Sequence, residues 1–226
     1  MTSTGTAGET DPRVEPAGIA DRIARTRRRL IDVVAVDVIE REIARPLPGL
    51  KPIPGFETHR VTNSQPGSWR ELVPATRWKT VERNLTRGDW GYLATKDERL
   101  AGQIWVSHVS HRDPWSGLHV RLAPDEAYSY AMEVAVAYRR PGVAASMVAA
   151  MLSDLHERGP AQRVYGWVDA RNRESQTLLR VVFGFTQVQT VKRVRLPRLG
   201  WQLPLSDDPR FGPVSRRGRH SGEIKV

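Results

Sequence analysis

The chain has 226 residues with an ordinary hydrophobic fraction of 39%, and its formal net charge is +10 at pH 7. It contains no cysteine, which excludes disulfides, thiolate metal sites and cysteine nucleophiles. No apolar run approaches the roughly 20 residues that a membrane-spanning helix needs, and the polar first residues lack the apolar segment of a secretory signal. We therefore expect a cytoplasmic protein that has no membrane partner.

The positive charge comes mostly from arginine, which is scattered along the chain. Lysine occurs only at positions 51, 79, 96, 192 and 225, and the main arginine clusters are at 27–29 and 216–219. A strongly basic chain attracts nucleic-acid phosphates, but a scattered arginine excess is also typical of genome base composition. Nucleic acid is therefore an alternative partner and not the expected one.

The two ends of the chain have the composition of disordered segments. Residues 1–18 are polar with few apolar side chains, and 205–226 are rich in Gly, Pro, Ser and charge. Such segments do not support a packed core. We expect a disordered N-terminus and a disordered basic tail.

Residues 19–45 carry apolar side chains among charges, and we predict an amphipathic helix there. The apolar positions are Ile23, Leu30, Val34, Ile39 and Ile43. The β-branched run LIDVVAVDV leaves a strand as the alternative. A Pro-rich linker at 45–55 is incompatible with a continuing helix. We therefore expect an N-terminal helical extension over 19–55 and a main domain over 56–204.

The main domain begins with a predicted strand over 56–62. Ser68 is a candidate N-cap for a helix that runs through Leu85. Two alternating apolar runs at 90–109 then flank the polar turn Lys96-Asp97-Glu98-Arg99. This pattern predicts a β-hairpin.

A strand over 127–136 leads into the most regular predicted helix of the chain. Its apolar residues recur at i, i+3, i+4, i+7, i+8 and i+11, at Ala144, Met147, Val148, Met151, Leu152 and Leu155. Gly159-Pro160 ends this helix. A strand at 164–168, a helix at 173–183 behind the N-cap Asn172, and one or two strands at 185–196 follow. This order predicts an α/β fold with a crossover connection.

The turn AYRRPGVAAS at 137–146 is the first candidate for a binding site. A helix that starts at a tight turn leaves backbone N–H groups free, and its dipole favours an anion there. Gly142 would let an anion approach those amides, and Arg139 and Arg140 add positive charge. An ordinary solvated turn is the structural alternative.

Three short patterns occur in and around this turn. They are Arg139-x-x-Gly142-x-Ala144, the preceding Val134-Ala-Val136-Ala-Tyr138, and a later set made of Asn172, Ser175 and Gly184-Phe185. In this order they resemble the pyrophosphate loop, the end of the fourth strand and the following Asn helix of the GNAT N-acetyltransferase superfamily. The likeness covers roughly 56–196 and is most specific over 137–185.

This resemblance implies a curved, mixed and mostly antiparallel sheet flanked by helices, whose fourth and fifth strands splay apart. It implies that acetyl-CoA lies in the gap as the cofactor, with coenzyme A as the product. The pantetheine arm would lie beside the backbone of Met132, Val134 and Val136, with Asn172 close to it. The residues implied for the pyrophosphate are Arg139, Arg140, Gly142, Val143, Ala144 and Ala145.

Three departures from the family pattern bear on the mechanism. Pro141 removes one amide from the loop. The interval from Asn172 to Gly184 is one residue longer than usual, which a bulged helix end would absorb. The family's tyrosine general acid is replaced by Leu179, or by Leu178 if the register slips, so that transfer would depend on positioning of the reactants.

The general base has two main candidates. Glu133 lies in an apolar strand interior, where burial would raise its pKa towards useful values; an ordinary ion pair with an arginine is the alternative. Glu126, near the start of the same strand, is the second candidate, and Asp169 is a third. His108 and His111 do not converge on one face, so we expect them to be solvated and predict no metal site.

The sequence thus predicts an N-acetyltransferase that moves acetyl from acetyl-CoA to a primary amine of a small molecule, peptide or protein in a ternary complex. A weak or inactive coenzyme A-binding module and an acetyltransferase for aminoacyl-tRNA remain as alternatives. Nothing in 56–124 identifies the amine-bearing acceptor. The 19–45 segment is free to pack on the sheet, cover the acceptor site or form a homodimer contact.

Overall fold

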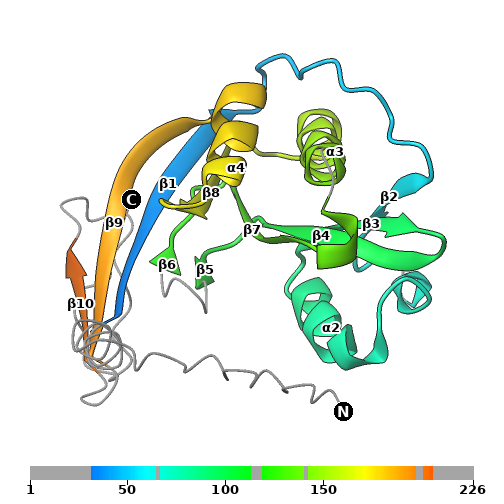
Figure 1. Cartoon of the computed structure of the whole chain (residues 1–226), viewed down its shortest axis with the longest axis horizontal. Coiled ribbons are helices and arrows are strands. Elements are labelled where there is room, and N and C mark those ends of the chain that lie inside the picture. Colours follow the sequence, from blue (N-terminus) through cyan, green and yellow to red (C-terminus); the bar gives the residue numbers. More distant parts are fainter. Residues whose placement is uncertain (1–31, 65–66, 113–118, 140–141, 197–200, 206–226) are drawn as a thin grey trace, which may run out of the picture.

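The computed structural model describes residues 32–64, 67–112, 119–139, 142–196 and 201–205 (Figure 1). An eight-stranded sheet has the spatial order β10-β9-β1-β8-β7-β4-β3-β2. Its strands are β1 (Asp32–Glu42), β2 (Phe56–Val61), β3 (Trp90–Lys96), β4 (Arg99–Ser107), β7 (Glu126–Val134), β8 (Arg163–Asp169), β9 (Thr186–Leu196) and β10 (Trp201–Leu205). A second, two-stranded sheet is formed by β5 (His111–Arg112) and β6 (His119–Val120).

Within the described residues, neighbouring strands of the large sheet are antiparallel with one exception. β7 and β8 run parallel, and their register joins Glu126 to Arg163 and Tyr128 to Tyr165. A parallel pair needs a crossover connection, which contains α3 (Val143–Arg158). In Figure 1 the strands β1 and β9 curve strongly away from the rest of the sheet. The expected curved, mixed and mostly antiparallel sheet is confirmed.

Helices cover both faces of the sheet. α3 and α4 (Arg173–Gln176) lie on one face, and α2 (Trp78–Thr86) lies on the other (Figure 1). Apolar side chains pack beneath α3 and α2, and their removal from water is the main force that holds the layers together. The core on the α3 face includes Ile104, Val106, Met147, Met151 and Leu155. The core on the α2 face includes Val81, Leu85, Leu93, Trp105 and Tyr128. No helix in the described ranges is long and apolar enough to cross a membrane.

The N-terminal segment departs most from the sequence prediction. The helix predicted over 19–45 is wrong for residues 32–42, which form β1, so the strand alternative is confirmed there; residues 19–31 lie outside the described residues. β1 pairs antiparallel with β8 on one side and with β9 on the other, so that Val36 lies opposite both Asp169 and Val191. β-branched residues favour strands, and two neighbouring strands satisfy the backbone on both sides.

β1 therefore belongs to the same sheet as the rest of the protein. The boundary expected between 19–55 and 56–204 does not separate two structural units, because β1 lies between β8 and β9. Residues 46–53 of the expected linker contain neither helix nor strand. The ends expected to be disordered, 1–18 and 205–226, lie outside the described residues apart from Leu205 at the end of β10.

The helix expected from Ser68 to Leu85 is divided into three pieces. Two short 3-10 turns, η1 (Ser68–Arg70) and η2 (Ala75–Arg77), precede α2, which begins only at Trp78. Pro74 has an extended backbone with ψ 140°. Proline lacks an N–H and its ring obstructs a helix interior, so the prediction of one continuous helix is wrong here.

The hairpin and the long helix are confirmed. β3 and β4 pair around Asp97 and Glu98, whose φ angles of 49° and 60° are typical of a two-residue hairpin turn. α3 ends at Arg158, and Gly159 follows it as the C-cap. Ala144 is an exception within the predicted apolar stripe, since it is only half-buried. It faces the groove described below.

The helix predicted at 173–183 accommodates one additional residue. α4 continues into a π-helical turn, η4 (Thr177–Val182), and the N–H of Phe183 donates to the carbonyl of Leu178, five residues earlier, at 3.1 Å. A π turn takes up one residue more than α-helical geometry does. The bulge expected between Asn172 and Gly184 is therefore confirmed, and Gly184 follows the helix with φ 69°.

Candidate functional site

The site lies where β7 and β8 separate. Their parallel pairing ends at Tyr128 and Tyr165. Beyond this point β7 pairs with β4 alone among the described strands, and its register shifts so that Ala131 and Met132 lie opposite Ile104. Ala131 has φ 50°, a left-handed conformation that marks a β-bulge. The bulge expected in this strand is confirmed, and the edge of β7 beyond it faces the gap.

A cavity of about 530 Å³ fills the space between the diverging strands. Its walls come from β1, β4, β7, β8 and the start of the α4–η4 helix. The lining is mostly apolar, with polar groups from Ser129, Asp169, Arg171, Asn172 and Ser175. A concave, largely apolar cavity of this size with a few polar groups is typical of a small-ligand site.

A second cavity of about 650 Å³ adjoins the first. The two share Met132, Asn172 and Ser175 as lining residues. The second cavity extends towards α3, where its further lining residues are Glu133, Val134, Arg139, Gly142, Ala144, Ala145, Glu174 and Leu178. We call the two cavities together the β7–β8 groove.

One end of the groove lies at the N-terminus of α3. Gly142 is the N-cap residue, and its carbonyl accepts a hydrogen bond from the N–H of Ser146 at 2.7 Å. The N–H groups of the first helical turn have no carbonyl partner within the helix. Together with the helix dipole, these amides form an anion-binding end.

The structure gives a reason for a glycine at position 142 that the sequence did not reveal. Its φ of 109° is a left-handed conformation that other residues disfavour. A Cβ atom at this position would also lie 2.7 Å from Cδ1 of Ile53 in the Pro-rich linker. The glycine is therefore required by the loop itself, in addition to any access that it gives to the amides.

The predicted cofactor residues reach the groove in most cases. Those that line it are Met132, Val134, Arg139, Gly142, Ala144, Ala145 and Asn172. Val136 does not line either cavity; it is 76% exposed on the 3-10 turn η3 (Val136–Tyr138). The side chain of Val143 is buried in the core, which leaves only its backbone for binding. Arg140 and Pro141 lie outside the described residues.

Two of these lining residues also have structural roles. Oδ1 of Asn172 accepts a hydrogen bond from the N–H of Ser175 at 3.1 Å, so the predicted N-cap is confirmed. Nε of Arg139 donates to the carbonyl of Val134 at 3.3 Å. Both contacts fix side chains at the wall of the groove.

Glu133, one of the two predicted bases, lines the groove but is not buried. Its side chain is 48% exposed and forms an ion pair with Arg77 of η2. Nε2 of Gln103 donates to the same carboxylate at 3.1 Å. The expectation of burial is wrong because β7 has already left β8 at this depth. The arginine ion pair, which was the alternative, is what the structure shows.

Glu126, the other predicted base, lies at the opposite end of β7. Its carboxylate is buried and accepts hydrogen bonds from the N–H of Ala123 at 2.9 Å and from the hydroxyl of Tyr165 at 3.0 Å. It lines a different cavity, beside His156 and Arg163. The structure does not bring Glu126 into the groove, so a role as base there is not supported.

Among the described residues of the groove, neither the hydroxyl of Tyr130 nor the carboxyl group of Asp169 is suited to donate a proton at neutral pH. Leu178 and Leu179 both line the groove where the family's tyrosine is expected. Tyr130 also lines it, but its hydroxyl donates to Oδ2 of Asp89 at 2.6 Å, and burial and that hydrogen bond raise its pKa. Hydrogen bonds from Arg171 hold the pKa of the third candidate base, Asp169, below its usual range.

Sequence reasoning missed a buried polar cluster on the α2 face of the sheet. Asp89 is fully buried at the junction between α2 and β3. Nε of Arg87 donates to Oδ2 of Asp89 at 2.9 Å, and Nη2 of Arg87 donates to the hydroxyl of Tyr130 at 2.8 Å. The alternating aromatics of β7 were a weak sequence signal, since Tyr130 lies 41 residues from Asp89 and shares no motif with it.

The two histidines expected in solvent pack against aromatic rings instead. His111 is 3% exposed and stacks on Tyr130 with ring centroids 4.1 Å apart. His108 packs against Trp90 with centroids 4.6 Å apart. Burial lowers the pKa of His108, although the charge of Asp89 acts in the opposite direction. The expectation of solvation is wrong because the chain after β4 lies over aromatic rings of β3 and β7.

The β7–β8 groove fits an elongated ligand with an anionic end. The first turn of α3 and Arg139 suit a pyrophosphate. The free edge of β7 suits the amide-bearing arm of a pantetheine, and the 530 Å³ cavity beyond it suits a small acyl group. These three regions follow each other in the order that coenzyme A requires.

Comparison with known proteins gives one matching family and several similar solved structures. The model of the acetyltransferase (GNAT) family matches residues 58–185. A tandem GNAT protein from the clavulanic acid biosynthesis pathway is 14% identical, with a TM-score of 0.50 over 83% of this chain and 61% of that one. A GCN5-related N-acetyltransferase from Kribbella flavida is 13% identical, with a TM-score of 0.47 over 90% of this chain and 65% of that one. No significant match to a curated protein was found.

The solved structures and the family model support different conclusions about this chain. This chain spans less than two thirds of either solved structure, and at 14% identity the first of them supports a shared fold and no more. The family match covers more than half of the chain and includes β7, the turn at Gly142 and the Asn helix. The chain belongs to the acetyltransferase (GNAT) family.

Proposed function

We propose that this protein transfers the acetyl group of acetyl-CoA to a primary amine of a small molecule, peptide or protein. Family membership supports acyl transfer from acetyl-CoA. The observation that carries the proposal is the continuity of the β7–β8 groove from the N-terminus of α3 to the gap between the two strands. Acetyl-CoA supplies the activated acetyl thioester.

In this proposal the backbone does most of the binding. The first-turn amides of α3, at Val143 to Ala145, hold the pyrophosphate, and Arg139 adds a positive charge beside them. The edge of β7 at Met132 and Val134 pairs with the amides of the pantetheine arm, as an added strand would. Asn172 and Ser175 form the opposite wall.

Glu133 is the proposed base. An ammonium group must lose a proton before its nitrogen can act as a nucleophile, and a carboxylate within reach takes that proton directly or through water. Glu133 lines the 650 Å³ cavity beside Met132, a residue that also lines the 530 Å³ cavity proposed for the acyl group, and Arg77 and Gln103 hold its carboxylate there. From this position the carboxylate would take the proton through water. Glu126 takes no part in this scheme.

The groove has leucines where the family's tyrosine acid is expected. With Leu178 and Leu179 at this wall, holding amine and thioester together must supply a large part of the rate. The same observation favours a second candidate function. In that alternative the protein binds coenzyme A tightly and turns over slowly or not at all.

Ala144 tests the proposed pyrophosphate site. It lies in the first turn of α3 and lines the groove. The substitution A144E places a carboxylate at the proposed pyrophosphate position, whereas A144Q adds nearly the same bulk without the charge. By isothermal titration calorimetry we expect A144E to lose about 100-fold in acetyl-CoA affinity, or about 2.8 kcal/mol, and A144Q to lose clearly less. A glutamate near a helix N-terminus stabilises the helix, so unfolding would not explain this difference.

Each possible result of these experiments tests one part of the proposal. A wild-type protein that binds no acetyl-CoA refutes the proposed function. An A144E variant that binds as tightly as wild type shows that the pyrophosphate lies elsewhere. Tight binding without thiol release over a broad panel of amines establishes the second candidate.

A further inference from the structure

The α4 wall of the groove is not held at its start by apolar packing. The first turn, α4, contains no buried residue, although Glu174 and Ser175 in it line the groove. The buried residues of this helix come later, at Leu179 and Phe183. A polar contact must therefore fix the first turn against the sheet.

Asp37 of β1 makes that contact. Its side chain is nearly buried, and Oδ2 accepts a hydrogen bond from Nε2 of Gln176 at 2.6 Å. The other oxygen, Oδ1, accepts from Oγ1 of Thr190 at 2.5 Å and from Nε2 of Gln187 at 3.2 Å, and both of these residues belong to β9. Hydrogen bonds to an ionised carboxylate are stronger than neutral ones. One carboxylate thus joins the helix to two strands.

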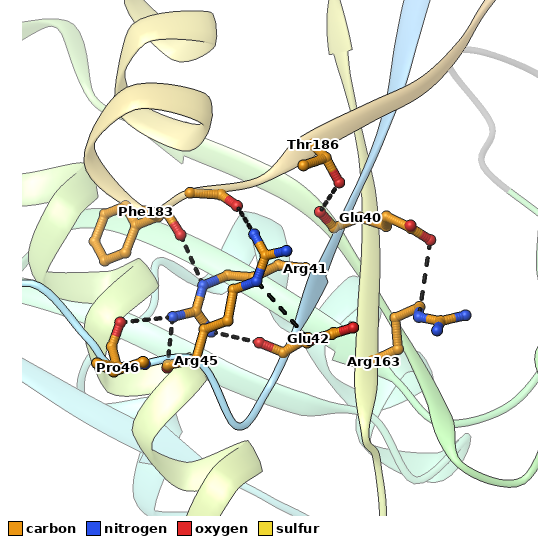
Figure 2. A network of polar contacts seen from close by, with 9 residues as sticks. Glu40, Arg41, Glu42, Arg45, Pro46, Arg163, Phe183 and Thr186 are labelled. Atoms are coloured by element: carbon orange, nitrogen blue, oxygen red, sulfur yellow. Dashed lines mark hydrogen bonds and ion pairs between the residues drawn. The ribbon is translucent and has the colours of Figure 1, made fainter.

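β1 and the turn after it also hold the far end of the same helix. Nε of Arg41 donates to the carbonyl of Phe183 at 2.7 Å, and Nη1 of Arg45 donates to the carbonyl of Gly184 at 2.9 Å. Figure 2 shows the two guanidinium groups directed at carbonyl oxygens where the helix ends. Positive charge at a helix C-terminus also complements the helix dipole.

We propose that β1 positions the α4 wall of the β7–β8 groove, and that the hydrogen bond between Gln176 and Asp37 sets the first turn. Neither residue lines the groove, so both are positioning residues. β1 lies outside the segment 58–185 that matches the family model, so the family match does not imply this support. The inference rests on the proposed function, because coenzyme A is taken as the ligand of the groove.

Two substitutions around the same carboxylate separate positioning from stability. Q176A removes the contact to the helix, and T190V removes a contact to β9, so each deletes one hydrogen bond to Asp37. Each also deletes a second hydrogen bond, from Arg180 to Oε1 of Gln176 at 3.5 Å and from Nε2 of Gln187 to Oγ1 of Thr190 at 2.9 Å. In full-length protein we expect Q176A to weaken coenzyme A binding about tenfold and T190V to stay within about twofold of wild type. Alanine is the best helix former, so Q176A retains the helix.

Hydrogen exchange in the ligand-free protein gives a second readout that needs no ligand. The amides of 173–178 should exchange about tenfold faster in Q176A than in wild type, by the same hydrogen-bond reasoning, and T190V should leave them nearly unchanged. Unchanged exchange and affinity in Q176A, or equal effects of both substitutions, would overturn the proposal. If wild type binds no coenzyme A, the proposed function fails, while the exchange rates still decide whether Gln176 holds the helix.

Discussion

Arg41 is a buried cation whose partners in the described residues are all backbone carbonyls (Figure 2). Its side chain is 1% exposed. The guanidinium donates to the carbonyls of Phe183 at 2.7 Å, Glu42 at 2.9 Å, Arg45 at 2.8 Å and Pro46 at 3.0 Å. R41M would remove all four hydrogen bonds and retain a side chain that fills much of the same volume.

The expected loss of stability follows from these contacts. Hydrogen bonds from a charged donor contribute about 1.5–3 kcal/mol each, so four give a gross contribution of about 6–12 kcal/mol. Burial of the guanidinium costs several kcal/mol, and burial, followed by the charge of Arg45, lowers the pKa of Arg41. R41M recovers this cost but leaves carbonyl oxygens without donors. The net loss in the free energy of unfolding should be about 3–5 kcal/mol.

Urea denaturation followed by tryptophan fluorescence measures this change. R45M is a matched control, because Arg45 is 46% exposed and, within the described residues, its side chain makes one hydrogen bond, to Gly184, and one exposed ion pair, with Glu42. Its loss should cost less than about 1 kcal/mol. If R41M also stays within about 1 kcal/mol of wild type, the four hydrogen bonds only offset the burial of the charge, and the reasoning is refuted.

Two further predictions concern titratable side chains. E133Q should lower kcat on an accepted amine about 100-fold, with little change in the KM for acetyl-CoA. This loss in kcat should become smaller at high pH, where the amine is already deprotonated. An equal loss at every pH would contradict a role as base. H108F keeps a ring against Trp90 but removes a titrating group. Because burial lowers the folded-state pKa of His108 below the unfolded value of about 6.5, the unfolded chain binds the proton first and stability falls as the pH drops through that window. Urea denaturation should therefore show a smaller loss of stability below about pH 6.5 in H108F than in wild type, and equal losses would count against a buried, neutral His108.

The elements that the sequence predicted well are those determined by local pattern. The apolar spacing from Met147 to Leu155 allows only one face of a helix to be buried, and α3 buries that face. The polar turn at 96–99 separates two alternating runs, and the hairpin follows directly. In both cases the neighbours that decide the structure lie within about one helical turn or one hairpin of each other.

For β1 the helix was preferred over the strand alternative, which is the one the structure shows, because the partners of β1 are remote in sequence. The spacing of the apolar residues Val34, Ile39 and Ile43 is compatible with one face of a helix and about equally with a strand that is covered on both faces. The choice depends on β8 and β9, which begin at Arg163 and Thr186. The sequence of these 11 residues does not show whether a neighbouring strand will be available to pair with them on each side.

Only part of the candidate site could be predicted, because some of its residues depend on contacts that are remote in sequence. The turn proposed to bind the pyrophosphate and Asn172 belong to one continuous stretch and could be recognised together. The burial of Glu133 depends on the exact residue at which β7 leaves β8, and the placement of Glu126 depends on the same point from the other side. Asp37 could not be identified at all, because its partners on α4 and β9 come from segments more than 130 residues away.

Because no tyrosine acid is present among the described residues at the helix wall of the groove, the support that β1 gives to this wall becomes more important. A site with a proton donor on its helix wall gains part of its rate from proton transfer. With Leu178 and Leu179 at that wall, the rate would depend more strongly on how well the reactants are held, and a misplacement of about 1 Å can cost about 100-fold. One side of the groove is β7, which is paired to β4 on both sides of the β-bulge at Ala131. The other side is a short helical turn without buried residues, so its position relies on Asp37, a residue that never touches the groove.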